Sequence, residues 1–418
     1  MITAASVGEQ LESVSAETPR ILIVGAGIAG ITLAQLLRVQ GLEPVLVDRS
    51  ADARRMIGDN RAGYMLALMP MVDPIIDALG VRDTYLDASV GIDRYVAHAH
   101  SGRVLRQDRL GDLLAEYGDY RGISRAALLT VLTGDDCPVA FGTTVSGLAE
   151  DERSVTVTWG DDSGAAAESA RTAFDIVVIA DGMNSRTRDL APSRGSLGAA
   201  RSADAVDTLD TAWGGWVCWA DADGSPDAVD EIWGDGFFLG MYPVKDGIGV
   251  FLGCPDSREP LGPRRFADEV RAKLKVLTPR IDACLEAIAT ARDPFFWPLR
   301  DSRARRWAEG RTVLLGDAAA GFLPTAGIGA GMAMESAHML ARAIAAGRDD
   351  PVTALKRFED RQRPRVEAAH ENSRALAGLM FDRSRLLAAA RDQVFRILSI
   401  RTALKPILKL LETPAEQM

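Results

Sequence analysis

The chain has 418 residues, a length that can bury a full hydrophobic core and form two interlocked domains. Hydrophobic residues make up 47% and charged residues 25% of the chain, which is the composition of a soluble globular protein. The net charge of −10 argues against a nucleic-acid-binding protein, because phosphate neutralisation requires a basic face.

Cysteine spacing and apolar runs indicate a cytoplasmic protein without a metal. Residues 1–19 are polar, which predicts a flexible N-terminal tail and no signal peptide. No apolar run reaches the roughly 18 residues of a spanning helix, so we expect no stable membrane insertion. His98 and His100 are two apart on a predicted strand, but too few further ligands exist for a metal site. Reduced thiols are expected at Cys137, Cys218, Cys254 and Cys284, which have neither CxxC nor metal-ligand spacing.

The first elements in chain order form a strand–helix–strand unit. Residues 20–24 are an apolar run that ends at Gly25, which is typical of a buried parallel strand. Residues 28–40 follow with helical spacing, and Gly41 ends that helix. Residues 44–48 predict a second strand. This order is that of a Rossmann βαβ unit.

The segment that follows mixes loops, helices and strands. A polar loop around Arg61 is expected to precede a helix over 70–79. Residues 92–108 alternate like an antiparallel hairpin that turns at Ser101-Gly102. Further expected elements are a helix over 124–132 and strands over 139–144, 154–159 and 174–180.

A second sheet, rich in Trp and Phe, is predicted from residue 211 onward. Its expected strands are 213–220, 231–241 and 247–253, followed by a helix over 265–289 and a strand-like segment over 294–299. Residues 312–315 predict one more short buried strand, which runs into Gly316-Asp317, and a helix over 329–346 follows. Residues 352–415 are expected to be helical, with interruptions near Pro364 and Pro406. The apolar face of residues 391–411 is expected to pack on the protein or a partner subunit, with a membrane-surface helix as the alternative.

The turn after the first strand carries the pattern GxGxxG. Gly25 permits the tight turn, Gly27 lets the backbone approach a pyrophosphate, and Gly30 allows close packing of helix on strand. The free N–H groups at the helix start favour phosphates. Asp48 ends the second strand, where an acid binds a ribose 2′-OH. The pattern predicts FAD or NAD and disfavours NADP, with a ligand-free structural turn as the alternative.

Two later segments narrow the choice of cofactor. Residues 175–188 (DIVVIADGMNSRTR) and 316–331 (GDAAAGFLPTAGIGAG) resemble the second and third fingerprints of the class A flavoprotein monooxygenases, the para-hydroxybenzoate hydroxylase-like family. The resemblance covers residues 20–375 and is specific in three motifs. It implies FAD as the bound cofactor and NAD(P)H as a transient reductant.

The resemblance also implies roles for individual residues. Asp181-Gly182 is placed near the FAD diphosphate, and Asp317 accepts hydrogen bonds from the ribityl chain. Pro324 borders the isoalloxazine, while Gly327 and Gly329 bring a helix N-terminus to its pyrimidine end, where negative charge gathers on reduction. The full set of expected FAD-binding residues is Gly25, Gly27, Ile28, Ala29, Gly30, Asp48, Arg49, Arg61, Arg125, Asp181, Gly182, Gly316, Asp317, Pro324, Gly327, Gly329 and Ala330.

Three arginines extend this resemblance, and one alanine departs from it. Arg125 matches the family's arginine that opens a helix close to FAD, and Arg186 and Arg188 are candidates for phosphate contacts. The family's usual histidine is replaced by Ala320. FAD binding therefore carries over more directly than any particular hydroxylation mechanism.

The expected fold is α/β, with a Rossmann-like FAD-binding domain, an inserted antiparallel β-sheet substrate domain and C-terminal helices. The FAD contacts come from distant segments, so the FAD-binding domain is expected to be discontinuous, over residues 20–90, 121–205 and 300–350. Residues 91–120 and 206–299 are assigned to the substrate-binding sheet, and residues 351–418 to the C-terminal helices.

The resemblance implies a single-component FAD monooxygenase. NAD(P)H would reduce the flavin, O₂ would add to form a C4a-hydroperoxide, and its terminal oxygen would pass to the substrate. No catalytic side chain is assigned beyond the flavin itself. A flavin-dependent halogenase is disfavoured, because no Lys precedes Lys245 and no WxWxIP motif occurs. A non-redox FAD protein with a cyclase-like role stays open because of Ala320.

The aromatic-rich second sheet suits a fairly apolar substrate, such as an aromatic, polyketide or terpenoid molecule. Trp213, Trp219 and Phe238 are the candidate substrate-binding residues, and strand alternation places Trp216 on the opposite face from the two other tryptophans. The protein is expected to act on this small molecule and O₂ as a monomer or homodimer.

Overall fold

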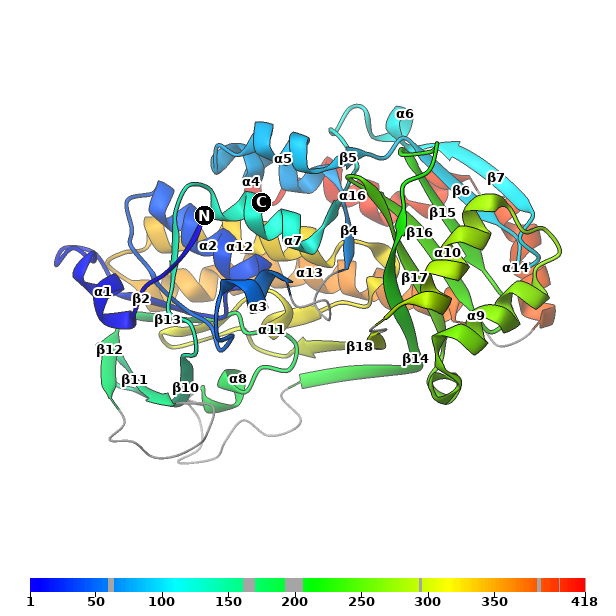
Figure 1. Cartoon of the computed structure of the whole chain (residues 1–418). Helices are drawn as coiled ribbons and strands as arrows, with labels where there is room; N and C mark the ends of the chain where they lie inside the picture. Colours follow the sequence, from blue (N-terminus) through cyan, green and yellow to red (C-terminus); the bar gives the residue numbers. More distant parts are fainter. Residues whose placement is uncertain are drawn as a thin grey trace.

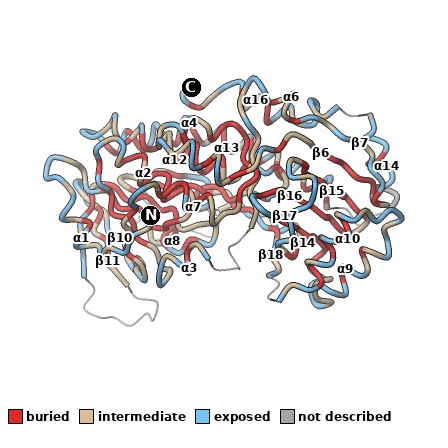
Figure 2. The backbone as a smooth tube through the Cα atoms, turned by 45° about the horizontal axis from the view of Figure 1, so that its top comes forward, coloured by how far each residue is buried: buried red, intermediate tan, exposed pale blue. Residues whose placement is uncertain are grey.

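The computed structural model of the chain describes residues 1–58, 64–160, 170–191, 206–292, 295–381, 385–397 and 399–417. A five-stranded sheet lies in one half of the molecule and a seven-stranded sheet in the other, and the strands β14 and β18 run from one half toward the other (Figure 1). The backbone is most deeply buried in the five-stranded sheet and the helices beside it (Figure 2).

The five-stranded sheet has the order β19-β20-β13-β2-β3. Its strands are β2 (Ile21–Val24), β3 (Val45–Val47), β13 (Ile176–Ile179), β19 (Ala308–Glu309) and β20 (Thr312–Leu314). All of them are parallel except β19, and every residue of the four parallel strands is buried. Continuous apolar runs of this kind are typical of parallel strands that are covered on both faces.

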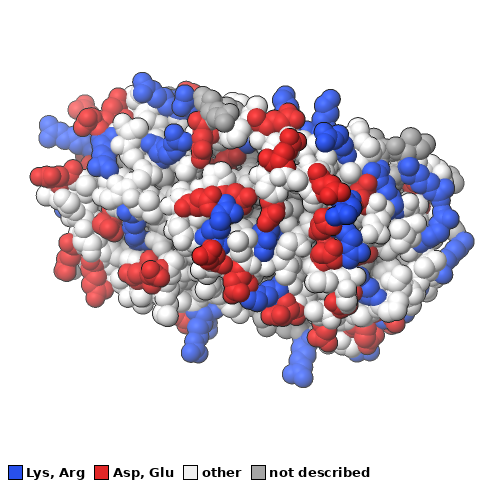
Figure 3. Space-filling model, turned by 90° about the horizontal axis from the view of Figure 1, so that it is seen from above, with Lys and Arg blue, Asp and Glu red and all other residues white. Residues whose placement is uncertain are grey.

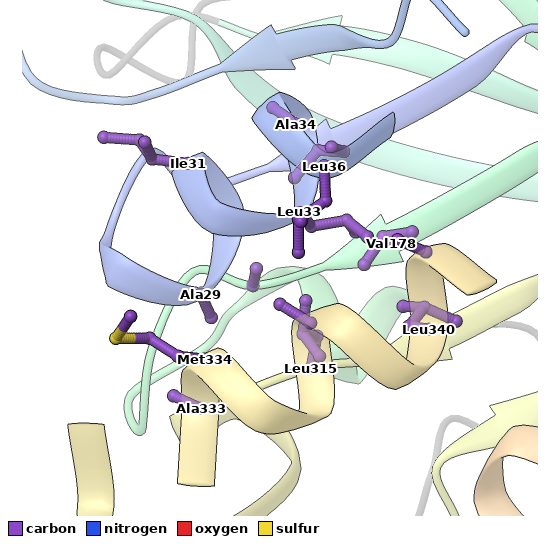
Figure 4. Close-up of a cluster of buried hydrophobic side chains, with 14 of the residues drawn as sticks. Ala29, Ile31, Leu33, Ala34, Leu36, Val178, Leu315, Ala333, Met334 and Leu340 are labelled. Carbon is purple, nitrogen blue, oxygen red and sulfur yellow. The ribbon is translucent and has the colours of Figure 1, made fainter. Parts of the chain in front are cut away.

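Two helices, α2 (Ile28–Val39) and α12 (Gly329–Ala346), pack side by side against this sheet. Ala29 and Leu33 of α2 lie next to Ala333 and Leu340 of α12, with Leu315 from the end of β20 beside them (Figure 4). The small side chains bring the starts of both helices close to the same edge of the sheet. The predicted strand–helix–strand unit and the helix over 329–346 are both confirmed.

The seven-stranded sheet has the order β18-β14-β17-β16-β15-β6-β7. Its strands are β6 (Arg94–His98), β7 (Val104–Arg109), β14 (Val206–Asp221), β15 (Ala228–Trp233), β16 (Phe238–Val244), β17 (Gly247–Pro255) and β18 (Phe295–Ala304). Neighbouring strands are antiparallel, apart from the parallel pair β15–β6. The predicted hairpin over 92–108 forms one edge of this sheet.

One face of the large sheet packs on α9 (Gly262–Lys273) and α10 (Pro279–Thr290) through Trp216, Val250 and Leu252. Alternate residues point to the other face, where Trp213 belongs to a separate buried cluster with Phe238 and Phe251. Trp213 and Trp216 therefore lie on opposite faces, as the alternation predicts.

The remaining elements surround these two sheets. The further strands are β1 (Ile2–Ala4), β4 (Met65–Leu68), β5 (Val90–Gly91), β8 (Arg121–Ser124), β9 (Cys137–Val139), β10 (Thr144–Glu150), β11 (Val155–Gly160) and β12 (Arg171–Phe174). The further α-helices are α1 (Val7–Glu12), α3 (Ala53–Gly58), α4 (Asp73–Ala78), α5 (Arg82–Ala88), α6 (Leu110–Leu114), α7 (Arg125–Thr133), α8 (Thr187–Leu190), α11 (Asp317–Ala320), α13 (Pro351–Met380), α14 (Arg385–Ile397), α15 (Ile400–Ala403) and α16 (Lys405–Glu412).

The prediction of a loose tail over residues 1–19 is wrong at its beginning. β1 pairs in parallel with β9, and the following helix α1 buries Gln10. The Gln10 side chain donates to the carbonyl of Ala5 and exchanges two hydrogen bonds, of 2.8 and 3.1 Å, with the backbone of Leu46 in β3. Polar composition hid this anchor, because its contacts are made by backbone groups and one amide.

Several predicted elements have other boundaries, and in place of the strand expected over 139–144, β9 ends at Val139 and β10 begins at Thr144. Residues 231–241 are the end of β15, a turn and the start of β16, since β15 and β16 pair antiparallel. The helix over 265–289 is divided into α9 and α10, because Thr278 caps a new helix by accepting from the N–H of Ile281 at 3.2 Å. α13 runs through Pro364 without a break, with Phe358 and Val366 buried on either side. Pro406 does lie in the first turn of a helix, α16.

The last α-helix packs on the protein, and the surface carries charges of both signs. α16 buries Ile407, Leu408 and Leu411 in the main hydrophobic core, so its apolar face packs on the protein. On the face seen in Figure 3, acidic and basic side chains lie interspersed. Among the helices that the structure describes, none combines the length and the hydropathy that crossing a membrane requires.

Candidate cofactor and substrate site

The carboxyl ends of the four parallel strands meet at one edge of the five-stranded sheet. In the sheet register Val24 pairs with both Val47 and Ile179, and Ile179 also pairs with Leu314. The register therefore brings together the residues that follow these strand ends, which include Gly25, Asp48, Asp181 and Asp317. This edge is where open α/β sheets bind ligands.

The three glycines of the first turn have different surroundings. A Cβ on Gly25 would lie 2.5 Å from the carbonyl oxygen of Ala180, and the φ angle of Gly25 is +105°. A Cβ on Gly30 would lie 1.9 Å from the carbonyl oxygen of Gly25. Around Gly27, in contrast, no atom of the described residues would come within 4 Å of a Cβ. The fold itself requires the outer two glycines, whereas Gly27 borders open space at the start of α2.

Asp48 is fixed at the end of β3 by backbone groups. One carboxylate oxygen accepts from the N–H of Ala26 and the other from the N–H of Ser50, both at 2.8 Å. A carboxylate has about four acceptor positions, so two hydrogen bonds leave capacity for ligand hydroxyls. Asp48 is thus held at the cavity with acceptor capacity left for a ligand.

The second motif follows β13 and contains a buried acceptor. Oδ2 of Asp181 accepts from the N–H of Thr187 at 3.4 Å, and Oδ1 is buried without a hydrogen-bond donor from the described residues. Arg186 lines the adjoining cavity. Arg188 is buried and donates to the carbonyl of Ala318 at 2.9 Å. The prediction that Arg188 contacts phosphate is therefore wrong, because its guanidinium joins the second motif to the third.

Asp317 opens the third motif beside Arg125 and Tyr64. Its carboxylate lines the cavity, and desolvation by the surrounding protein raises its pKa to about 6 while Arg125 opposes this shift. Burial, with the charge of Asp317 as a second cause, raises the pKa of Tyr64 to about 12. Arg125 also donates to the carbonyl of Met56 at 3.3 Å. A carboxylate in such a site gains from ligand hydroxyls that donate to it.

The start of α12 forms another part of the same wall. Pro324 begins a short 3₁₀ turn, Gly327 follows it, and α12 begins at Gly329 without a side-chain cap. The first N–H groups of this helix are thus available at the cavity, together with the positive end of the helix dipole. Such an end favours a group that becomes negatively charged.

A cavity of about 1130 Å³ adjoins all of these features. Among the expected cofactor residues, those that line it are Gly25, Gly27, Ile28, Ala29, Asp48, Arg49, Arg125, Asp181, Gly182, Asp317, Pro324, Gly327, Gly329 and Ala330. Gly30 and Gly316 support the wall from behind, since Gly30 packs on Gly25 and Gly316 on Ala29. Arg61 lies outside the described residues. Open space at Gly27 and the carboxylates of Asp48 and Asp317 fit the diphosphate, ribose and ribityl groups of FAD, in that order.

The cavity continues from the strand edge to the seven-stranded sheet. Phe238, Phe251 and Val217 form an apolar part of its wall, and only Phe238 of these was expected. Trp213 is not among the described residues that line the cavity, because it is buried and stacks on Phe381 with 5.1 Å between ring centroids. Trp219 lies near the end of β14 with 43% of its surface exposed, away from the lining.

Sequence reasoning missed a polar cluster on the same face of the large sheet. Glu231 accepts hydrogen bonds from Tyr95, Tyr242 and Trp233, and all four line the cavity. Tyr95 and Glu231 are 136 residues apart, so the cluster is not a sequence motif. The one available signal was an acidic residue on the face of an aromatic-rich strand.

The structure also places Ala320 and two of the histidines. Ala320, at the family's histidine position, is buried at the end of α11. His370 of α13 reaches the next residue, with Nε2 3.1 Å from the carbonyl oxygen of Gly321 and its ring 5.2 Å from that of Phe322. Burial lowers the pKa of His370, so a neutral ring donates this bond. His98 instead pairs with Asp230 on the opposite face of the large sheet.

Comparisons with known proteins agree with this geometry. Residues 18–373 match the family described as FAD binding domain. The 6-hydroxynicotinate 3-monooxygenase of Pseudomonas fluorescens is 29% identical over 350 residues, 78% of this chain and 83% of that protein. The 3-amino-4-hydroxybenzoate 2-monooxygenase of Streptomyces cremeus is 28% identical over 386 residues, 86% of each chain. Klebsiella pneumoniae HpxO, solved with FAD and uric acid, shares the fold with a TM-score of 0.74, 20% identity, and coverage of 95% of this chain and 96% of HpxO.

Proposed function

The chain belongs to the FAD-binding domain family, and from this premise we propose that it is an FAD-dependent monooxygenase that uses NAD(P)H and O₂ to oxygenate a fairly apolar small molecule. One observation carries the proposal: a single cavity joins the glycine loop and both later motifs to an aromatic sheet face. Relatives that are similar over most of the chain are named as monooxygenases, which disfavours the halogenase alternative.

Individual residues would hold FAD along the strand edge. The start of α2 at Gly27 would bind the diphosphate, Asp48 the adenosine ribose, and Asp317 the ribityl hydroxyls. The start of α12, from Gly329, would face the pyrimidine end of the isoalloxazine, with Pro324 beside it. When bound, FAD supplies the redox chemistry, taking electrons from NAD(P)H and activating O₂ for transfer of one oxygen atom.

The protein supplies binding, orientation and the exclusion of water. The apolar wall of Phe238, Phe251 and Val217 lies across the cavity from polar strand ends. Leu376 of α13 and Leu404, which lies between α15 and α16, form further parts of the lining. An apolar wall of this kind would exclude water from the bound cofactor and hold an apolar substrate in place.

This proposal also assigns the parts of the chain. Residues 20–90, 121–205 and 300–350 would form the FAD-binding domain, and residues 91–120 and 206–299 the substrate-binding sheet, with the C-terminal helices across both. We propose that the protein works in the cytoplasm, in keeping with four free cysteines, as a monomer or homodimer.

Labelled oxygen tests the proposed reaction. The FAD-loaded protein is incubated with NADH or NADPH, ¹⁸O₂ and a panel of phenols and hydroxypyridines, and products are analysed by mass spectrometry. We expect one ¹⁸O atom in the product of an accepted substrate and none from H₂¹⁸O. Protein that retains FAD but gives no labelled product with the panel would support the non-redox, cyclase-like alternative.

A further inference from the structure

Glu231 is the centre of a polar group on the substrate side of the cavity. It accepts hydrogen bonds of 2.7 Å from the hydroxyls of Tyr95 and Tyr242, and one of 2.9 Å from the indole N–H of Trp233. All four side chains line the cavity. Three protein donors therefore fix both oxygens of one carboxylate at a wall that the expected FAD-binding residues do not form.

The sheet register explains how distant residues form this group. Gly240 of β16 pairs with Glu231 of β15, and Tyr242 is two residues further along the same face. A Cβ on Gly240 would lie 2.5 Å from the Tyr242 ring, so the glycine makes room for the ring to lie toward Glu231. On the other side, Ala97 of β6 pairs with Glu231, which brings in Tyr95 two residues earlier.

The polarity of the group follows from its hydrogen bonds. Burial, with the charge of Glu231 as a second cause, raises the pKa of Tyr95 and of Tyr242 well above the ordinary value. Both hydroxyls therefore stay protonated and donate to Glu231. A hydroxyl whose proton is donated in this way offers a ligand only its lone pairs, and a carboxylate only accepts. Toward the cavity the group thus presents acceptors and negative charge.

Neighbouring charges leave this polarity unchanged. Arg106 and Asp108 line the cavity from β7, and their side chains form an ion pair with each other. Arg391 of α14 lies against the ring of Trp233 and donates to the carbonyl of Gly234 at 3.1 Å, and it is not among the described residues that line the cavity. Among the described residues that line this wall, Arg106 and Asp108 offset each other's charge, and Glu231 adds a further negative charge.

We propose that Glu231 determines specificity for a substrate that presents a protonated amine or another N–H donor to the seven-stranded sheet, an inference that rests on the proposed function. The surrounding aromatic rings favour a cation as well. A carboxylate at this position would meet a negative charge and no free donor from the cluster. The substrates in the relatives' names, nicotinate and benzoate derivatives, carry a carboxylate, which this wall would disfavour, whereas the amino group of 3-amino-4-hydroxybenzoate is a donor of the kind that Glu231 would accept.

Two probes of opposite charge on the same ring test the assignment. 4-Hydroxybenzylamine and 4-hydroxybenzoate are titrated into the FAD-loaded protein, and binding is followed by the change in flavin absorbance. We expect the amine to bind about tenfold or more tightly than the benzoate, and Glu231→Gln to lower that ratio by about tenfold. Tyr242→Phe keeps the carboxylate and should change the ratio less than Glu231→Gln does. Glu12→Gln, an exposed change on α1, is the charge-matched control.

Two results would overturn the assignment: tighter or equal binding of the benzoate to the wild-type protein, or an amine preference that persists in Glu231→Gln. The titration requires bound FAD and no turnover. A protein with the Glu231-dependent preference that consumes no O₂ would contradict the proposed monooxygenase and leave the role of Glu231 intact. An active monooxygenase without the preference would contradict the role of Glu231 alone.

Discussion

The two ends of the cavity are built by different means. The cofactor end is formed mainly by backbone groups. Parallel strands end in register there, and the residues after them belong to short contiguous motifs. At the substrate end, side chains from three strands converge on Glu231 across 136 residues of sequence. A backbone site depends on glycines and strand ends, whereas a side-chain site depends on sheet register. Changes at one end are therefore expected to leave the other largely intact.

The largest expected effect is at the third glycine of the loop. Gly30→Ala places a methyl group 1.9 Å from the carbonyl oxygen of Gly25, which forces α2 away from the strand. We expect FAD binding to be lost and the free energy of unfolding to fall by about 3 kcal/mol. Thermal unfolding and flavin retention on a desalting column measure both quantities.

Gly27→Ala is the matched control for that change. Its added methyl group meets no described atom within 4 Å, so the apoprotein should unfold as the wild type does. FAD should bind about tenfold more weakly, because the methyl group occupies the approach to the diphosphate. Equal destabilisation by both substitutions would contradict the division between supporting and ligand-facing glycines.

Asp317→Asn should weaken FAD binding by about 10- to 100-fold, because it replaces a charged acceptor of ligand hydroxyls with a neutral one. Fluorescence titration of the apoprotein with FAD measures this loss. The FAD affinity of Asp48→Asn, which makes the same replacement at the proposed ribose position, is compared with it. Unchanged affinity in Asp317→Asn would remove the proposed contact with the ribityl chain.

The same carboxylate predicts a pH dependence of apoprotein stability. Burial raises the pKa of Asp317 from 3.8 to about 6, so between these values the folded protein holds a proton that the unfolded chain has lost. Stability should therefore fall as pH rises through this window. Asp317→Asn should flatten the slope without abolishing it, since burial also raises the pKa of Asp73 to about 6. Denaturant unfolding at pH 4 to 7 measures the slope of stability against pH. An identical slope in the variant would contradict the raised pKa of Asp317.

The smallest expected effect is on amine binding at the substrate end, and it tests whether the two ends of the cavity are independent. Gly240→Ala should displace the Tyr242 ring, so that Glu231 loses one of the three donors that orient it, and we expect binding of 4-hydroxybenzylamine to weaken by about fivefold. FAD affinity should stay within about twofold of the wild type. Gly224→Ala, where no described atom lies within 4 Å of the added carbon, is the control. A large loss of FAD in Gly240→Ala would show that the two ends are coupled.

The parallel strands at the proposed cofactor site could be predicted from the sequence because local patterns encode them. Apolar runs followed by Gly25, Asp48, Asp181 and Asp317 identify parallel strands whose ends must share one edge of the sheet. The helix over 329–346 was predicted with its boundaries because Gly329 begins it and Gly347 follows it.

The substrate end could not be predicted in the same way. The order β16-β15-β6 places Glu231 between Tyr242 and Tyr95, and no local pattern states that order. Trp213 and Trp219 were candidates as aromatic residues, but Phe381, which follows α13, stacks on the first, and the second is exposed away from the lining. The N-terminal strand β1 was missed for a related reason, because its partner β9 lies more than 130 residues away.

Anaerobic stopped-flow spectroscopy of the FAD-loaded protein tests the central claim most directly. We expect NADH or NADPH to bleach the long-wavelength absorbance of oxidised flavin, faster when an accepted substrate is present, and O₂ to restore it with consumption of one O₂ per product. A flavin that stays oxidised under both reductants, or that consumes no O₂ with any compound of the panel, would contradict the account.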